Sequence, residues 1–223
     1  AAAERLRAEI RITTSLRHPN VVRCLGYEWA GDEVSIFLEY AARGCMAGVL
    51  RARGPLGGQE LRSAARGLVR GVAHLHALAR PVLHRDLKAA NLLVHRDGRV
   101  VIADFGCSTI LGERCTGLAG SPPWMAPEVI MARPYGLEAD VWSLGCTVLE
   151  MATAEAPWGE GAFDNALAAM RAIGMTRATP PVPAGVPARC ADLVKACTRR
   201  AAADRPVAAD LLDHAYIGGV LNL

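Results

Sequence analysis

The stretch over residues 84–106 constrains the fold and the chemistry of this chain more than any other. Two short apolar runs in it flank an Asp-Gly pair, a pattern that predicts a β-hairpin. The hairpin would carry Asn91 at its entry and Asp104 at its exit, with Asp86 in the loop that leads in. A tight hairpin can therefore hold an amide and two carboxylates around one small volume.

These residue types suit phosphoryl transfer. The reaction needs metal ions to neutralise phosphate charge and a residue to orient the attacking hydroxyl. Asp104 and Asn91 offer oxygen ligands of the kind that Mg²⁺ prefers. Asp86 can accept the proton of a substrate hydroxyl, and Lys88 can reach the transferred phosphate. The stretch thus predicts Asp86, Lys88 and Asn91 as catalytic residues, and Asn91 and Asp104 as metal ligands.

The order and spacing of these residues resemble the protein kinase family. The run His-Arg-Asp-Leu at residues 84–87, followed by Asn91, matches the catalytic-loop pattern of that family. Asp-Phe-Gly at residues 104–106 matches its metal-binding motif. Lys88 and the segment at residues 120–128 look like those of serine/threonine kinases. The subfamily most resembled is the MAP kinase kinase kinases, through residues 18–26, 140–153 and 169–174.

The resemblance implies an α+β, two-lobed kinase fold with a mostly helical large lobe. Residues 1–38 would be the remnant of the small lobe, with its regulatory helix and last two strands. Residues 39–223 would form the hinge and the large lobe. The implied activity is transfer of the ATP γ-phosphate to serine or threonine of a protein substrate, such as a MAP kinase kinase. ATP and Mg²⁺ would be the cofactors.

The resemblance also implies binding and regulatory roles. Glu9 would pair with a lysine on an earlier strand, as the helix glutamate of the family does. Arg85 would bind a phosphate on the activation loop. Thr116 is the first candidate for that phosphorylation and Ser121 the weaker one. The residues expected around the nucleotide are Leu38, Glu39, Ala41, Leu93 and Asp104.

Structural roles follow from the same resemblance. Asp140, at the start of an apolar helix, would hydrogen-bond the backbone near His84 and Arg85. Arg205 would form an ion pair with Glu128. Phe105 would take part in the packing beneath the metal-binding motif.

Apolar periodicity and turn residues predict the remaining elements. Strands are expected at residues 21–27 and 34–38. Helices are expected at residues 4–17, 45–53, 57–78, 138–153, 163–173, 189–199 and 207–214.

Composition narrows the class further. No apolar run approaches the roughly 20 residues that cross a membrane as a helix, so no membrane span is expected. The 25 basic residues are dispersed rather than clustered, which argues against a nucleic-acid-binding arm. Seven cysteines, an odd count without a Cys-x-x-Cys pair, suit reduced thiols in a cytoplasmic protein.

One part of the kinase pattern has no counterpart in the sequence. No Gly-rich phosphate loop precedes Glu9, and its partner lysine is missing as well. We therefore expect an N-terminally truncated domain whose small lobe lacks its first strands, and a chain that is inactive by itself. A non-catalytic kinase-like module that binds partners is the alternative. The presence of Asp86, Lys88, Asn91 and Asp104 favours the enzyme.

Overall fold

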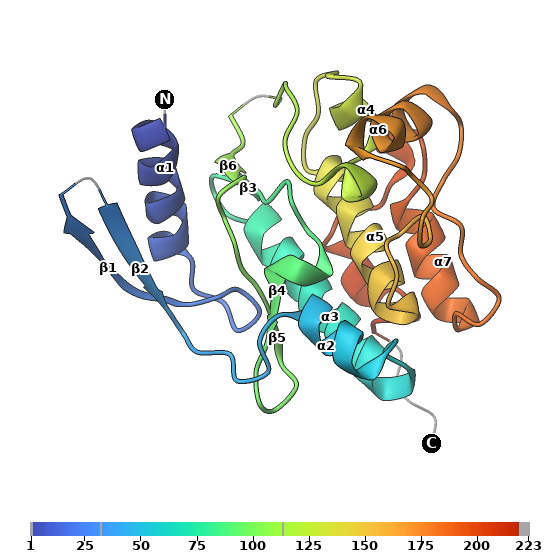
Figure 1. Ribbon diagram of the computed structural model, residues 1–223, viewed down its shortest axis with the longest axis horizontal. Helices are drawn as coiled ribbons and strands as arrows, with labels where there is room; N and C mark the ends of the chain where they lie inside the picture. Colours follow the sequence, from blue (N-terminus) through green and yellow to red (C-terminus); the bar gives the residue numbers. More distant parts are fainter. Residues whose placement is uncertain (1, 32, 113, 219–223) are drawn as a thin grey trace.

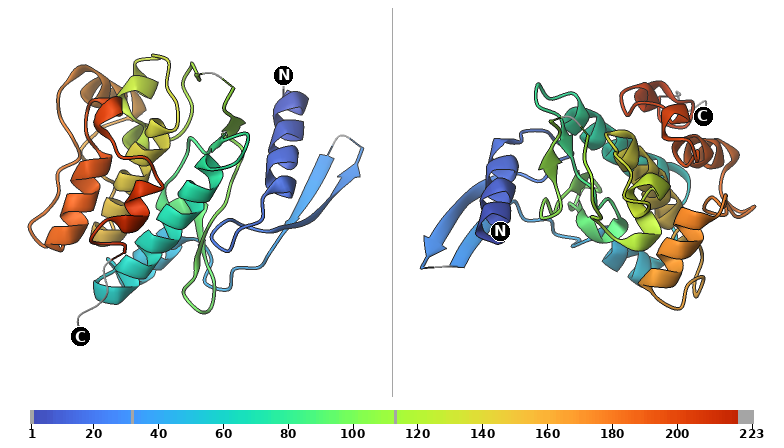
Figure 2. Two further views of the ribbon diagram at one scale, coloured as in Figure 1. Left: turned by 180° about the vertical axis from the view of Figure 1, so that it is seen from behind. Right: turned by 90° about the horizontal axis from the view of Figure 1, so that it is seen from above.

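The computed structural model describes residues 2–31, 33–112 and 114–218, without the side chains of residues 2–6, 8 and 9. One helix and a two-stranded sheet stand beside a larger, mainly helical body (Figure 1, Figure 2). We call residues 2–38 the N-terminal region and residues 39–218 the C-terminal region. The mixture of helices and sheets agrees with the expected α+β class.

The N-terminal region consists of α1 (Ala2–Ser15), β1 (Cys24–Ala30) and β2 (Glu33–Leu38). The two strands pair antiparallel. Ile12 and Leu16 lie four residues apart along α1 and the segment after it, and both are buried. Helix α1 contacts β1, so it covers part of this small sheet.

The predicted strand at residues 21–27 begins too early. Val21 instead forms an isolated parallel bridge with Ile102, and β1 starts only at Cys24. Val21 pairs with Ile102, which is distant in the sequence, instead of with β2. A local sequence pattern cannot show which of these two pairings forms. The second predicted strand, at residues 34–38, agrees with β2 to within one residue.

Helices are the main regular elements of the C-terminal region. Its main helices are α2 (Met46–Arg53), α3 (Gly58–His76), α4 (Pro127–Ile130), α5 (Glu138–Thr153), α6 (Ala166–Met175) and α7 (Ala188–Cys197). Its short strands are β3 (Val82–Leu83), β4 (Leu92–Val94), β5 (Val100–Ile102) and β6 (Thr109–Ile110). Its 3₁₀ turns are η1 (Ala89–Asn91), η2 (Pro122–Trp124), η3 (Ala202–Asp204) and η4 (Asp210–Asp213).

Two predicted helix boundaries are wrong for local reasons. Helix α6 starts at Ala166 because the Asn165 side chain accepts a hydrogen bond from the Ala168 amide, 2.9 Å away, and so caps the helix. The helix expected at residues 207–214 is only the turn η4. Its backbone hydrogen bonds run three residues back rather than four, which is the 3₁₀ pattern.

Helix α5 forms the centre of the C-terminal region, as Figure 1 shows, with α3 and α7 packed against it. Trp142 and Leu144 on α5 are fully buried, and so is Leu68 on the apolar stripe of α3. Gly145 permits the close approach of α7, because a Cβ added there would lie 2.6 Å from the Cys197 Cβ. All seven cysteines are free, as expected. No helix in the described ranges has the length and apolarity to cross a membrane.

The two regions meet where the turn after α1 crosses the hairpin β4–β5. Asn20 donates from Nδ2 to the Val100 carbonyl, 2.8 Å away, and the Ile102 amide donates to the Asn20 carbonyl at 2.9 Å. The rings of His18 and His74 stack beside this contact, with centroids 4.6 Å apart. These interactions anchor the N-terminal region to both the hairpin and α3.

Candidate active site

The predicted hairpin is confirmed. Strands β4 and β5 pair antiparallel, with Leu92 opposite Ile102. One step beyond that pair, the Ala103 amide donates to the Asn91 carbonyl over 2.9 Å. Asp104 follows Ala103, so the strand ends bring Asn91 and Asp104 to the same edge of the hairpin, as the sequence predicts.

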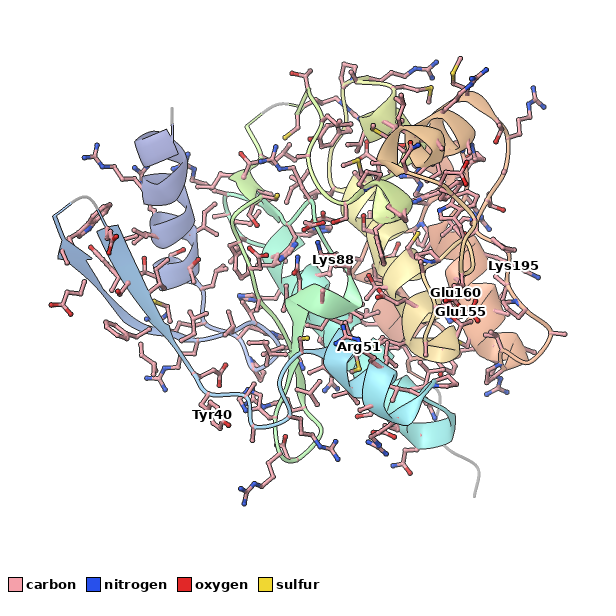
Figure 3. All side chains as sticks on the ribbon, in the orientation of Figure 1. Tyr40, Arg51, Lys88, Glu155, Glu160 and Lys195 are labelled. Carbon is pink, nitrogen blue, oxygen red and sulfur yellow. The ribbon has the colours of Figure 1, made fainter. Side chains whose placement is uncertain are left out.

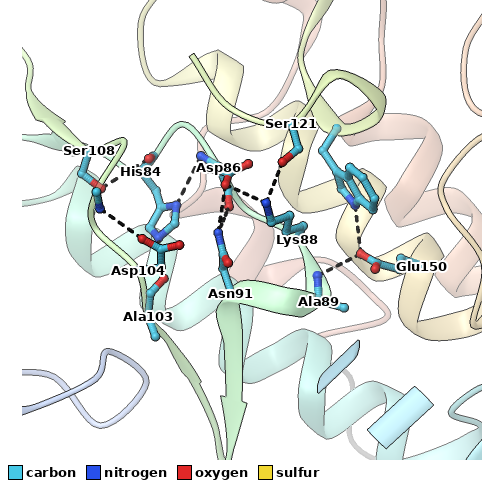
Figure 4. Close-up of polar contacts among 12 residues, drawn as sticks. His84, Asp86, Lys88, Ala89, Asn91, Ala103, Asp104, Ser108, Ser121 and Glu150 are labelled. Atoms are coloured by element: carbon cyan, nitrogen blue, oxygen red, sulfur yellow. Dashed lines mark hydrogen bonds and ion pairs between the residues drawn. The ribbon is translucent and has the colours of Figure 1, made fainter. Parts of the chain in front are cut away.

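Asp86 and Asn91 are directly hydrogen-bonded to each other. The Asn91 amide nitrogen donates to the Asp86 carbonyl at 2.8 Å and to Asp86 Oδ2 at 3.0 Å (Figure 4). Lys88 Nζ lies 2.8 Å from the same Oδ2 and 2.6 Å from Ser121 Oγ. The structure therefore gathers the three predicted catalytic residues and Ser121 into one cluster.

The other carboxylate oxygen of Asp86 has a different environment. Oδ1 is buried and has no hydrogen-bond partner among the described residues. Burial disfavours the ionised form, but the hydrogen bond and charge of Lys88 and the hydrogen bond from Asn91 outweigh it and lower the pKa of Asp86. An ionised carboxylate with one unsatisfied oxygen is suited to accept a proton from an incoming hydroxyl.

A buried carboxylate at the start of α5 holds the loop in place. Asp140 Oδ2 accepts from the His84 amide and Oδ1 from the Arg85 amide, both at 2.8 Å, which confirms the predicted contact. His76 Nε2 lies 3.0 Å from Oδ2. Burial opposes ionisation of Asp140, but the hydrogen bond and charge of His76 outweigh it and lower its pKa.

Two residues of the site hold a strained backbone. Arg85 has φ = 67° and Asp104 has φ = 63°, both in the left-handed region that residues other than glycine rarely adopt. Arg85 is held there by Asp140, and Asp104 Oδ1 accepts from the Gly106 amide at 3.2 Å. Such strain is typical of functional sites.

The oxygen atoms of Asn91 and Asp104 fit a magnesium ion. The Asn91 amide nitrogen donates both of its hydrogen bonds to Asp86, which leaves its oxygen for a cation. Asp104 is exposed beside it. An amide oxygen and a carboxylate are hard ligands, and Mg²⁺ commonly takes one or two protein ligands and completes its shell with phosphate oxygens. In the described part of the chain, no three or more His, Cys, Asp or Glu residues form a metal cluster.

The packing contacts of the site are also present. Phe105 is buried and meets the His84 ring edge-on, at a centroid distance of 5.1 Å. Arg205 forms a bidentate pair with Glu128 at 2.6 and 2.9 Å, which confirms the predicted contact. The guanidinium also lies 5.1 Å from the centroid of the Trp142 ring.

The residues expected around the nucleotide lie at the end of β2 and just after it, on β4, and just after β5. Leu38 ends β2, and the Glu39 side chain accepts from the Arg23 amide at 2.9 Å. The segment just after Ala41 runs along β4, where Cys45 bridges to Leu93. The fold thus brings the two halves of the predicted nucleotide set together, and their role stays a prediction.

The residues with predicted regulatory roles make fewer described contacts with the catalytic cluster than the predicted catalytic residues do. Glu9 lies outside the described side chains, so its predicted pairing is not placed. Thr116 is exposed, next to a bridge between Cys115 and Tyr135. Arg85 directs its Nε toward the Cys107 carbonyl. The Ser121 hydroxyl accepts a hydrogen bond from Lys88 Nζ, and the roles of Thr116 and Ser121 stay predictions.

The sequence prediction missed Glu150. Its Oε2 accepts from the Ala89 amide at 2.8 Å and from Trp124 Nε1 at 2.9 Å (Figure 4). The sequence did carry a sign of this role, because Glu150 is the one charged residue among residues 141–153. A charge in the middle of a buried helix needs hydrogen-bonding partners.

A family model described as the protein kinase domain matches residues 1–217. The chain belongs to the protein kinase family. The motif-based expectation is therefore confirmed. This kinase domain is similar over nearly all of its length to several MAP kinase kinase kinases. It is 40% identical to YODA of Arabidopsis thaliana over 100% of the chain, and 37% identical to ANP1 of the same plant over 98%.

The similarity extends to animals, with 36% identity to mitogen-activated protein kinase kinase kinase 1 of Homo sapiens over 95% of the chain. The kinase domain spans 25%, 33% and 14% of the lengths of these three relatives.

Proposed function

We propose that this kinase domain transfers the γ-phosphoryl group of ATP to serine or threonine hydroxyls of a protein, as part of a cytoplasmic signalling enzyme. The observation that carries the proposal is the cluster around Asp86. An ionised, buried carboxylate with one unpartnered oxygen lies between a lysine ammonium and an asparagine amide. That arrangement suits the transfer of a proton and the stabilisation of phosphate charge.

Each residue of the cluster has a defined task in this proposal. When bound, Mg-ATP supplies the phosphoryl group and the cation that neutralises it. Asp86 Oδ1 would accept the proton of the acceptor hydroxyl, and Lys88 would offset the charge of the transferred group. Asn91 and Asp104 would hold the magnesium ion. Leu38, Glu39, Ala41 and Leu93 would line the adenine site.

The substrate and its regulation are inferred from the relatives. Their names describe MAP kinase kinase kinases, and we propose that the substrate of this kinase is a MAP kinase kinase. Lys88 at the site supports serine/threonine specificity. We keep Thr116 as the proposed activating phosphorylation site, with Arg85 as the residue that binds its phosphate and Glu9 as the helix glutamate that pairs in the active state.

The test is Asp86→Asn in the full protein. Transfer from labelled ATP to an inactivated MAP kinase kinase should fall by about 10²–10⁴-fold, the usual contribution of a positioned base. Nucleotide affinity should change little. Asp164→Asn, at an exposed aspartate on the same chain, is the matched control and should behave as the unmodified protein.

Two results would count against the proposal. Equal transfer by the Asp86→Asn variant would remove Asp86 from the role of base. Background transfer by the unmodified protein, with tight partner binding retained, would point to a non-catalytic module instead.

A further inference from the structure

Glu150 is a carboxylate in an unusual position. It lies near the end of α5, a helix whose residues 139–151 are all buried, and its own exposure is 9%. Burying a carboxylate in an apolar interior is costly unless it is well hydrogen-bonded. Its hydrogen bonds therefore indicate which parts of the domain it holds.

A single oxygen atom of Glu150 joins two loops. Oε2 accepts from the Ala89 amide, at the start of the turn between Lys88 and Asn91. The same Oε2 accepts from the indole of Trp124, at the end of the turn that follows Ser121. One loop carries the catalytic cluster, and the other carries the hydroxyl that Lys88 contacts, so Glu150 connects the two sides of the site (Figure 4).

The neighbouring residues of α5 support the same loops. Asp140, Ser143 and Glu150 are separated by three and seven residues, a spacing that puts them on one face of a helix. Asp140 binds the His84 and Arg85 amides, and Ser143 Oγ donates to the Trp124 carbonyl at 2.8 Å. This polar stripe on a mainly apolar helix contacts both loops: Asp140 and Glu150 bind the catalytic loop, and Ser143 and Glu150 bind Trp124.

We propose that Glu150 is a positioning residue for phosphoryl transfer: its carboxylate keeps the catalytic loop and the loop after Ser121 in register by accepting both hydrogen bonds at once. The inference rests on the proposed function. It assigns to this chain a residue that touches neither the nucleotide nor the acceptor hydroxyl. By fixing the Ala89 amide, Glu150 would fix the positions of Lys88 and Asn91, which lie on either side of Ala89 in the catalytic loop.

The electrostatics make this coupling sensitive to pH. Burial raises the pKa of Glu150 to about 7, against the opposing effects of the Ala89 and Trp124 hydrogen bonds and the Lys88 charge. Among the described residues, Lys88 and also Cys146 on α5 interact with Glu150 through their charges. The loop after Ser121 presents only the neutral side chains of residues 121–124. Protonation near neutral pH removes the negative charge that strengthens both bonds.

The test compares Glu150→Gln, Glu150→Ala and the exposed control Glu155→Gln, which lies just beyond the end of α5 (Figure 3), in the full protein. In the unmodified protein kcat should fall as the pH drops below about 7. Glutamine can accept both bonds without titrating, so Glu150→Gln should keep kcat within about threefold and lose that dependence. Glu150→Ala should lower kcat by about 10- to 100-fold, the scale of a small misplacement, with KM for ATP unchanged.

A second measurement does not depend on activity. The Trp124 indole N–H resonance, assigned with Trp124→Phe, should shift with pH near 7 in the unmodified protein and stay constant in Glu150→Gln. The pKa of Asp86 lies below its ordinary value, so a titration near 7 would not be that of the base.

The outcomes separate the two proposals. If the unmodified protein shows no Asp86-dependent transfer, the proposed function fails, and the indole titration still reports whether Glu150 couples the loops. If transfer depends on Asp86 but Glu150→Gln keeps the fall in kcat below pH 7, the inference is wrong. Full kcat in Glu150→Ala would also overturn it. Should Glu150→Ala fail to fold, the glutamine variant and the indole resonance decide.

Discussion

The strands β1 and β2 of this kinase domain expose large aromatic side chains, whereas the centre of the C-terminal region buries them. In the N-terminal region, Tyr27, Trp29 and Phe37 are 49%, 44% and 50% exposed. In the C-terminal region, Trp142 and Tyr135 are completely buried. The first region is a two-stranded sheet with one helix beside it, and a two-stranded sheet alone is marginally stable. The second has a central helix covered on several sides.

This contrast indicates where the folding free energy resides. Burial of apolar area is the main favourable term in folding, at about 25 cal/mol per Å² removed from water. Side chains that stay half exposed contribute little of it. We infer that the C-terminal region folds cooperatively and sets the stability, while the N-terminal region depends on the contacts of Asn20 and His18 with the hairpin and α3.

The largest expected effect comes from the buried ion pair of the C-terminal region. Arg205→Leu leaves Glu128 without its partner in the interior, and loss of one member of such a pair costs about 3–5 kcal/mol. Arg53→Leu is the control, because its pair with Glu60 is about half exposed on both sides and should contribute less than about 1 kcal/mol. Urea unfolding measures both. Equal losses from the two variants would contradict a stability that resides in this interior.

A matched pair of leucines compares the regions directly. Leu75 on α3 is fully buried, and Leu25 on β1 is 61% exposed. Leu75→Ala should cost about 2–5 kcal/mol in the free energy of unfolding, because it opens a cavity. Leu25→Ala should stay within about 0.5 kcal/mol, as surface changes usually do. A large loss from Leu25→Ala, measured by the same urea titration, would show that the exposed face of β1 takes part in cooperative folding.

The smallest expected effect concerns the junction between the regions. Burial lowers the pKa of both His18 and His74 below the ordinary value of 6.5, and for His18 the charges of His74 and Arg70 add to the effect. A histidine whose pKa is lower in the folded state takes up its proton less readily there than in the unfolded chain. The contact should therefore weaken as the pH falls below about 6.5.

Amide hydrogen exchange across β1 is the measurement for this effect. As the pH falls below about 6.5, exchange across β1 should quicken relative to its intrinsic pH dependence, while exchange in α5 should not. The double variant His18→Phe/His74→Phe keeps two stacked rings that do not titrate and should remove the response. A response that survives in this variant would exclude the histidine pair as its source.

The sequence alone was sufficient to predict those elements whose structure is determined by one local pattern of residues. The apolar run at residues 138–153 predicts α5 with its observed bounds, since no proline interrupts it. The Asp-Gly turn predicts the hairpin, and the hairpin fixes the approach of Asn91 to Asp104. Most of the catalytic cluster follows from these two local facts together with the kinase motifs.

The remainder depends on partners that are distant in the chain. Glu150 contacts residues 61 and 26 positions away, so its role is hidden until the loops are folded around α5. Val21 pairs with Ile102 rather than starting β1, because a tertiary contact overrides the local strand pattern. Ser121 looked like a modification site from its polar loop, and only the fold shows its bond to Lys88.

The left-handed backbone at Arg85 changes what mutagenesis of that position can reveal. Glycine adopts such a conformation freely and asparagine tolerates it, whereas β-branched side chains resist it. Replacing Arg85 by valine would thus mix two losses, one of the charged group and one of the peptide geometry that Asp140 fixes. In a library covering every amino acid at residue 85, the stability of the variants should follow how readily each residue adopts a positive φ. Glycine and asparagine should then be among the most stable. The ranking for phosphate-dependent activation should follow charge, and only there should lysine outrank glycine.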